Sequence, residues 1–239
     1  MVNFVLVAGA RLGAWAWDDV APRLRAAGHG VHPLTLSGLA EKRGTPAGQQ
    51  THVRDIVAEV ERLDLREVVL VGHSYAGVPA GQAAGRIGER LARIVLVDAA
   101  VPVDGESFAQ GWPDGGRELV GELAANGGHW PRATAAHFAG HDLTDEQIAR
   151  IVAGSTPHPG ATLTEPAALT RPLGELPGTY VLCLPAGEEP SAQDLAELPA
   201  GEHWRLVELR TGHWPMFSRP GELARILLDA AGAGEIGAS

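Results

Sequence analysis

The chain has 239 residues and a hydrophobic fraction of 45%, which suits one α/β domain with a sizeable core. Its net charge of −10 at pH 7 argues against a nucleic-acid partner, and no apolar run approaches the roughly 18 residues of a membrane-spanning helix. Its single cysteine, Cys183, excludes an internal disulfide, and the first residues lack the basic stretch of a signal peptide, so we expect a cytoplasmic protein.

Strand-like and helix-like segments alternate along the chain. Short apolar runs rich in β-branched residues predict strands, and apolar residues at helical spacing predict helices. In chain order we expect strands at 4–7, 31–36, 68–71, 91–97, 180–184 and 204–209, and helices at 17–27, 49–63, 78–87 and 223–231. This order predicts an α/β fold with a mostly parallel central sheet and helices on both faces, in a single domain spanning 1–239.

The composition changes between about residues 102 and 177. Glycine, proline, tryptophan and histidine become frequent there, strand patterns disappear, and short helices are expected at 117–125 and 144–153. A long insertion after the carboxyl end of a strand would lie over the edge of the sheet where ligands bind. We therefore expect a small helical cap, with a peripheral decoration as the alternative.

The most distinctive motif, Gly-His-Ser-Tyr-Ala-Gly at 72–77, comes directly after a predicted buried strand and before a predicted helix. This arrangement is typical of the nucleophile elbow, a sharp turn that lifts a serine hydroxyl above the strand ends. Glycine is needed because strand and helix approach closely there. We predict Ser74 as the nucleophile, although the strict motif has glycine in place of Ala76; the alternative is a structural serine in an ordinary turn.

A second motif, Thr-Gly-His-Trp-Pro-Met at 211–216, follows the last predicted strand. A histidine in that loop can reach over the strand ends to the elbow, and a general base must meet its nucleophile in space rather than in sequence. The chain order, serine first and histidine last, is one of the known orders of a catalytic triad. We predict His213 as the base and expect His73 to point away from the serine hydroxyl.

The loop after the first strand contains small residues that bring backbone close to the elbow. We predict that the backbone amides of Ala10 and of Tyr75, the residue after the nucleophile, form an oxyanion hole. An ordinary glycine-containing strand exit is the alternative.

Together these motifs resemble the compact α/β-hydrolases related to plant methylesterases and hydroxynitrile lyases. The residues that carry the resemblance are 8–10, 13–17, 72–74, 98–102 and 212–216, and it extends from about residue 5 to residue 228. The resemblance implies an α/β-hydrolase fold, a Ser–His–acid triad, a small helical cap and small ester substrates.

Two positions depart from that family. Ala8 stands where the family usually has a histidine that supports the oxyanion loop. The loop after the strand at 180–184 has Ala186 where the family's triad acid is expected. Glu188 or Glu189 could substitute from a shifted loop, but we prefer Asp98, because a strand end is more rigid than a proline-glycine loop and the acid must hold the imidazole in one orientation. A turn cap is the alternative role for Asp98.

The sequence thus predicts a serine hydrolase acting through an acyl-enzyme on a small, apolar carboxylic ester, lactone or thioester, with no metal or organic cofactor. Aromatic residues are expected to line the pocket: Trp15, Trp112, Trp130 and Trp214, with Trp17, Phe108 and Phe138 as further candidates. One alternative is a lyase or cyclisation catalyst using Ser74 and His213 as acid and base, although a cyanohydrin lyase would carry lysine in place of Trp214. Another is a non-catalytic protein that binds a small molecule. The sequence is compatible with a homodimer.

Overall fold

A six-stranded, wholly parallel sheet forms the centre of the computed structural model, which describes residues 1–112, 114–191, 198–199 and 201–232. Its strand order is β2-β1-β3-β4-β7-β8. The strands are β1 (Asn3–Val7), β2 (Gly30–Leu34), β3 (Val68–His73), β4 (Leu91–Val97), β7 (Gly178–Leu184) and β8 (Trp204–Arg210). The predicted α/β fold with a parallel sheet is confirmed.

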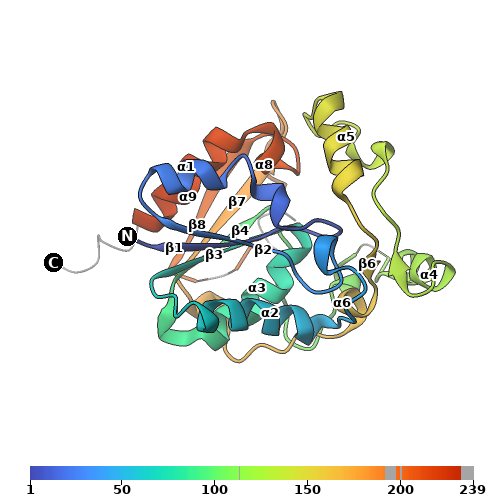
Figure 1. Ribbon diagram of the computed structural model, residues 1–239, viewed down its shortest axis with the longest axis horizontal. Helices are drawn as coiled ribbons and strands as arrows, with labels where there is room; N and C mark the ends of the chain where they lie inside the picture. Colours follow the sequence, from blue (N-terminus) through green and yellow to red (C-terminus); the bar gives the residue numbers. More distant parts are fainter. Residues whose placement is uncertain (113, 192–197, 200, 233–239) are drawn as a thin grey trace.

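Helices cover both faces of this sheet (Figure 1). Helices α1 (Ala21–Ala26) and α9 (Pro220–Gly232) pack on one face, and α2 (Gln49–Arg62) and α3 (Gly77–Ile87) pack on the other. Because side chains alternate along a strand, β1 serves both layers: Phe4 and Leu6 join the core under α1 and α9, whereas Val5 and Val7 join the core over α2 and α3. Burial on both faces explains why β1, β3 and the second half of β4 read as continuous apolar runs.

The predicted helix at 17–27 is interrupted. The structure has a 3-10 helix over Ala14–Trp17 and starts α1 only at Ala21. Pro22 lies in the first turn of α1, the one place in a helix where the missing amide hydrogen of proline costs no hydrogen bond. The break therefore follows from the position of the proline.

Between β4 and β7 the chain forms the insertion, residues 102–177, which holds α4 (Arg117–Ala125), α5 (Asp145–Gly154) and α6 (Ala161–Thr164). It also holds an antiparallel pair, β5 (His129–Trp130) with β6 (His158–Pro159). The prediction that this region lacks strands is wrong, because two-residue strands are too short to show an alternating pattern. Figure 1 shows α4 and α5 lying to one side of the sheet.

Parallel strands end at the same edge of a sheet, so the residues that follow β3, β4 and β8 are neighbours in space. Ser74 follows β3, Asp98 follows β4, and His213 follows β8 three residues after its end. The fold alone therefore assembles a serine, a carboxylate and a histidine from three distant parts of the sequence. Along the described part of the chain, no helix combines the length and the apolar character needed to cross a bilayer.

Candidate active site

Ser74 lies on a sharp turn between β3 and α3, with a φ of 54° in the left-handed region that side chains rarely adopt. The turn is compact: a Cβ on Gly72 would lie 2.9 Å from the carbonyl oxygen of Ala76. A Cβ on Gly77 would collide with the carbonyl oxygen of Ala100. Both glycines of the motif are therefore required by close packing, and the strained backbone is the geometry of a nucleophile elbow.

His213 bridges the serine and the carboxylate. Its Nε2 lies 2.9 Å from Ser74 Oγ, and its Nδ1 lies 2.5 Å from Asp98 Oδ2. The Asp98 and His213 side chains are 20% and 28% exposed, so the contact is partly shielded from water. An imidazole with its Nδ1–H donated to a carboxylate presents a free lone pair on Nε2, which can accept the hydroxyl proton of the serine.

The carboxylate of Asp98 is held from two sides. Oδ1 of Asp98 accepts a hydrogen bond of 3.1 Å from the backbone N–H of Cys183. The backbone N–H of Asp98 donates to the carbonyl oxygen of Val181 at 2.8 Å. The alternative acid, Glu188, is exposed in the loop after β7, where its backbone carbonyl accepts a hydrogen bond from Arg210. Of these two carboxylates, Asp98 is the one that the structure brings to the imidazole.

His73, inside the elbow motif, serves the backbone rather than the nucleophile. It is fully buried, and its Nε2–H donates to the carbonyl oxygen of His213 at 2.7 Å. Burial lowers the pKa of His73 well below that of an ordinary histidine, so the ring is neutral. His73 therefore ties the loop of His213 to the strand that carries Ser74.

Aromatic rings surround the imidazole of His213. The ring centroids of His213 and Trp214 are 4.8 Å apart, and the ring of Trp214 also packs edge-on against Phe138 and His141. His141 lies in the insertion, and burial together with the nearby His213 lowers its pKa. Sequence reasoning missed His141, because no motif marks it and its approach depends on how the insertion folds back.

A cavity of about 270 Å³ opens beside Ser74. Its walls come from the loop after β1, the elbow, the histidine loop and the insertion: Gly9, Ala10, Arg11, Leu12, His73, Ser74, Phe108, Trp112, Trp130, His137, His213 and Trp214. Three of the four predicted tryptophans, Trp112, Trp130 and Trp214, line it. Sequence analysis did not single out Arg11 or Leu12 within the loop after the first strand, nor His137 in the insertion.

Trp15 does not line this cavity, so its assignment to the pocket is corrected. Its ring packs against Phe217, with centroids 5.8 Å apart, and covers Gly154 of α5, where the absence of a side chain makes room for it. It borders a separate hollow on the other side of the loop. Trp17 and Phe138 are buried in the core under α1 and α9.

The loop after β1 passes directly beside the nucleophile. A Cβ on Gly9 would lie 2.8 Å from the Cβ of Ser74, and the next residue, Ala10, lines the cavity. The side chain of Tyr75 is fully buried, with its hydroxyl 2.9 Å from His52 Nδ1. Tyr75 can therefore offer only its backbone amide to a ligand at Ser74.

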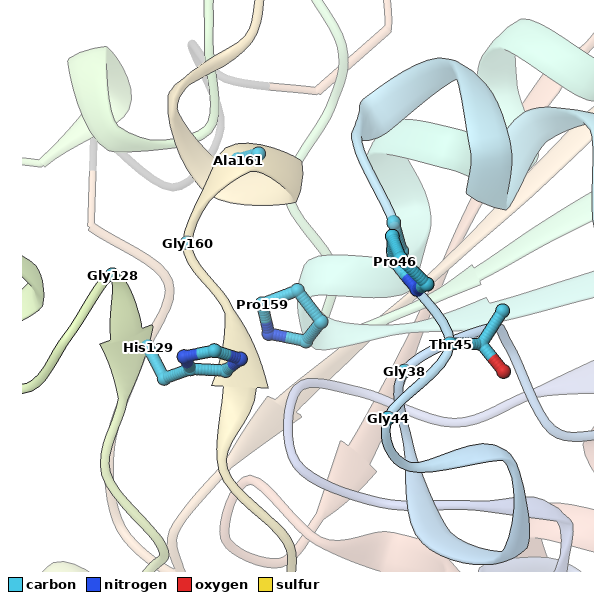
Figure 2. A pocket seen from close by; sticks show the side chains of 10 residues that line it. Gly38, Gly44, Thr45, Pro46, Gly128, His129, Pro159, Gly160 and Ala161 are labelled. Carbon is cyan, nitrogen blue, oxygen red and sulfur yellow. The ribbon is translucent and has the colours of Figure 1, made fainter.

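A second hollow, of about 430 Å³, lies between the loop at 38–47 and the insertion (Figure 2). Figure 2 shows His129 and Pro159 on one side of it and Thr45 and Pro46 on the other. The residues lining this hollow include no serine, cysteine or carboxylate. Among the residues that the structure describes, no group of three or more histidine, cysteine, aspartate or glutamate side chains could hold a metal ion.

Comparisons with known proteins show what the chain is similar to. A family model described as "Alpha/beta hydrolase family" matches residues 4–226. The "Carbendazim hydrolyzing esterase" of Nocardioides sp. (strain SG-4G) is 33% identical over 242 residues, which cover 95% of this chain and 98% of that protein. "Methylesterase 9" of Arabidopsis thaliana is 27% identical, with 97% and 98% covered.

Solved structures show the same fold at lower identity. An extracellular alpha/beta-hydrolase from a Paenibacillus species superposes with a TM-score of 0.83 at 22% identity, covering 96% of this chain and 99% of that one. Tomato Methylketone Synthase I, complexed with 2-tridecanone, has a TM-score of 0.72 at 18% identity, covering 98% and 99%. The resemblance to plant methylesterases and bacterial esterases is confirmed.

Proposed function

The chain belongs to the alpha/beta hydrolase family, and from that premise we propose that it is a carboxylic ester hydrolase in which Ser74, His213 and Asp98 form the catalytic triad. The observation that carries the proposal is the unbroken contact from Ser74 Oγ to His213 Nε2, at 2.9 Å, and from His213 Nδ1 to Asp98, at 2.5 Å. Curated relatives named as esterases, which cover nearly the whole chain, support the same reaction class.

In the first step Ser74 Oγ attacks the carbonyl carbon of the ester while His213 Nε2 accepts the hydroxyl proton. The carbonyl π electrons move onto oxygen, which becomes an alkoxide. Asp98 accepts the hydrogen bond from Nδ1–H and so fixes the tautomer and stabilises the imidazolium. The backbone amides of Ala10 and Tyr75 donate to the alkoxide, and one such donor lowers the barrier by about 3–4 kcal/mol.

In the second step the bond to the alcohol oxygen breaks and His213 returns its proton to that oxygen. The alcohol leaves and the acyl group stays on Ser74. Water then attacks the acyl-enzyme with His213 again as base, releasing the carboxylic acid and restoring the serine. The aromatic walls of the cavity, with Trp112, Trp130 and Trp214, surround the substrate and keep the remaining water out.

Labelling with a fluorophosphonate tests the nucleophile directly, because it forms a stable bond only with an activated serine. We expect one phosphonyl group per chain, on the peptide that contains Ser74, and a burst of 4-nitrophenol from 4-nitrophenyl butyrate. Ser74→Ala should abolish both while its circular dichroism spectrum stays that of the wild type. Labelling at another serine, or an unlabelled protein that still hydrolyses the ester, would contradict the proposal.

The lyase or cyclisation alternative was favoured by two features, the absence of a triad acid after β7 and Ala8 in the loop after β1. The contact of Asp98 with His213 Nδ1, from the end of β4, supports a triad whose acid is Asp98. A lyase would turn over its substrate with no acyl-enzyme, so the burst experiment distinguishes the two reactions. A non-catalytic binding protein would show neither labelling nor burst.

A further inference from the structure

Arg11 is a buried cation in the wall of the catalytic cavity. It follows Ala10 in the loop after β1, with a φ of 71°, and only 7% of the residue is exposed. Within the described residues its Nε and Nη2 are buried without a hydrogen-bond partner, and the guanidinium forms no ion pair. A buried charge normally has a partner of opposite charge, and in the described part of the chain the guanidinium of Arg11 in this cavity has none to which it is hydrogen-bonded.

The surroundings of Arg11 fix its position without neutralising it. Its backbone N–H donates to His158 Nδ1 at 3.1 Å, and its carbonyl accepts from the N–H of Thr156 at 2.9 Å. The guanidinium carbon lies 3.6 Å from the ring centroid of Trp130, a cation–π contact that covers one face of the group. Stacking on a ring does not satisfy the N–H groups of a guanidinium, so Nε and Nη2 of Arg11 keep their capacity to donate hydrogen bonds.

The charged and titratable neighbours of Arg11 leave it positive. Glu122 of α4 is the nearest counter-charge, but it is exposed and its carboxylate accepts the Nε1–H of Trp130 at 2.8 Å. Burial lowers the pKa of Arg11 to about 10 while Glu122 acts to raise it, so the group stays protonated at neutral pH. His158 of β6 adds no charge, because burial and nearby cations lower its pKa well below the ordinary value. His73, His137 and His213 are the other titratable residues that line the cavity.

We propose that Arg11 binds a carboxylate on the substrate, so that the enzyme prefers esters that carry a carboxylate to matched neutral esters. This rests on the proposed esterase function and names its substrate class. A carboxylate offers two oxygens to the planar fork of a guanidinium, and such bidentate pairs are the strongest ordinary hydrogen bonds in proteins. The cavity of about 270 Å³ limits the partner to a short molecule, such as the half-ester of a small dicarboxylic acid.

Two matched pairs of substrates test this preference, one with the carboxylate on the acyl part of the ester and one with it on the alcohol part. The 4-nitrophenyl half-ester of adipic acid is compared with 4-nitrophenyl hexanoate, in which a methyl group replaces the carboxylate. For the alcohol side, 4-acetoxybenzoate is compared with 4-acetoxybenzamide. We expect wild-type kcat/KM to favour the anionic member of at least one pair, mainly through KM, and to lose that preference as salt rises.

Arg11→Met keeps a long apolar side chain over Trp130 and removes the charge. We expect the ratio of kcat/KM for the anionic ester to that for the neutral ester to fall about 100-fold in Arg11→Met and to be partly restored in Arg11→Lys. The control is Arg43→Met, an exposed arginine that lines a separate hollow, which should leave the ratio unchanged. An equal loss on both esters of a pair would mean that Arg11 only supports the loop, and would overturn the proposal.

Binding without turnover separates this inference from the esterase proposal. Calorimetric titration of Ser74→Ala with the adipate half-ester at constant ionic strength should show binding that Ser74→Ala/Arg11→Met loses. If the wild type hydrolyses neutral esters but shows no preference for either anionic partner, the role of Arg11 is refuted and the esterase stands. If no ester is hydrolysed but the carboxylate still binds through Arg11, the reaction is wrong and the recognition stands. Should Arg11→Met not fold, the wild-type ratios alone decide.

Discussion

Replacing Asp98 by asparagine tests the least expected member of the proposed triad. The two side chains have the same shape, so the turn after β4, in which Asp98 has a φ of 43°, should be preserved. In the structure Oδ1 accepts from the N–H of Cys183 and Oδ2 faces His213 Nδ1. An amide has only one oxygen, and the bond from Cys183 favours placing it at the Oδ1 position. The NH₂ group would then face the imidazole and favour the tautomer that carries its proton on Nε2, which cannot accept the proton of Ser74.

The expected loss follows from this change of tautomer. The analogous aspartate-to-asparagine change in a serine protease lowers kcat by about 10⁴. The contact here is short, at 2.5 Å, but the Asp98 side chain is 20% exposed, so water can partly replace the lost acceptor. We therefore expect Asp98→Asn to lower kcat by between about 10² and 10⁴, a barrier increase of roughly 2.7–5.5 kcal/mol, with little change in KM.

Steady-state kinetics on 4-nitrophenyl butyrate measures this loss, with Glu188→Gln as the matched control. Glu188 is exposed, and its replacement should change kcat by less than tenfold. The assignment fails if Asp98→Asn stays within tenfold of the wild type. If Glu188→Gln is the crippled variant, the acid lies in the loop after β7. If neither is impaired, Ser74 and His213 act as a dyad, and the lyase or cyclisation reaction becomes the better proposal.

Four further outcomes are expected. Ser74→Ala should reduce ester hydrolysis to background with an unchanged melting temperature, and a folded variant with wild-type rates would exclude this nucleophile. His213→Ala should lower kcat on the same ester by about 10² to 10⁴, because the general base is lost, and a folded variant with wild-type rates would exclude His213 as the base. Gly77→Ala should lower the free energy of unfolding, measured by urea titration, by more than about 1 kcal/mol, because the added Cβ meets the carbonyl oxygen of Ala100. Its control is Gly121→Ala, whose Cβ would lie in open space on α4 and which should be neutral or stabilising. Burial holds the pKa of His158 well below its unfolded value of about 6.5, so the unfolded chain binds more protons than the folded one in mild acid. The free energy of unfolding should therefore fall by about 1.4 kcal/mol from pH 7.5 to 5.5 for each buried neutral histidine. In His158→Gln the free energy of unfolding should depend less steeply on pH over this range.

Patterns within a few residues of one another predict the sheet and the ends of its strands. The elbow is recognisable because its strand, turn and helix are contiguous, and because the close packing at Gly72 and Gly77 excludes other residues. Parallel topology then places Asp98 and the loop of His213 at the same edge without further information. These placements follow from local sequence and from the geometry of parallel strands.

The walls of the cavity depend instead on where the insertion returns to the sheet. Arg11 is held by His158, 147 residues away in sequence, and no local pattern encodes that distance. The error at Trp15 has the same origin: its neighbour is Gly154 of α5, so a tryptophan near the oxyanion loop turns away from the cavity. Aromatic composition predicts that a pocket exists but not which rings line it.

The residues that the sheet places are those proposed for the reaction, and the residues that depend on the insertion are those proposed for the choice of substrate. The residues of the proposed triad follow strand ends that the sheet fixes relative to one another, and His73 adds a hydrogen bond between the elbow strand and the loop of His213. The selecting residues come from the insertion and from Arg11, whose guanidinium rests on Trp130. Changes at the strand ends should therefore act on kcat for every ester, whereas changes at Trp130 or Arg11 should act on KM and differ between esters.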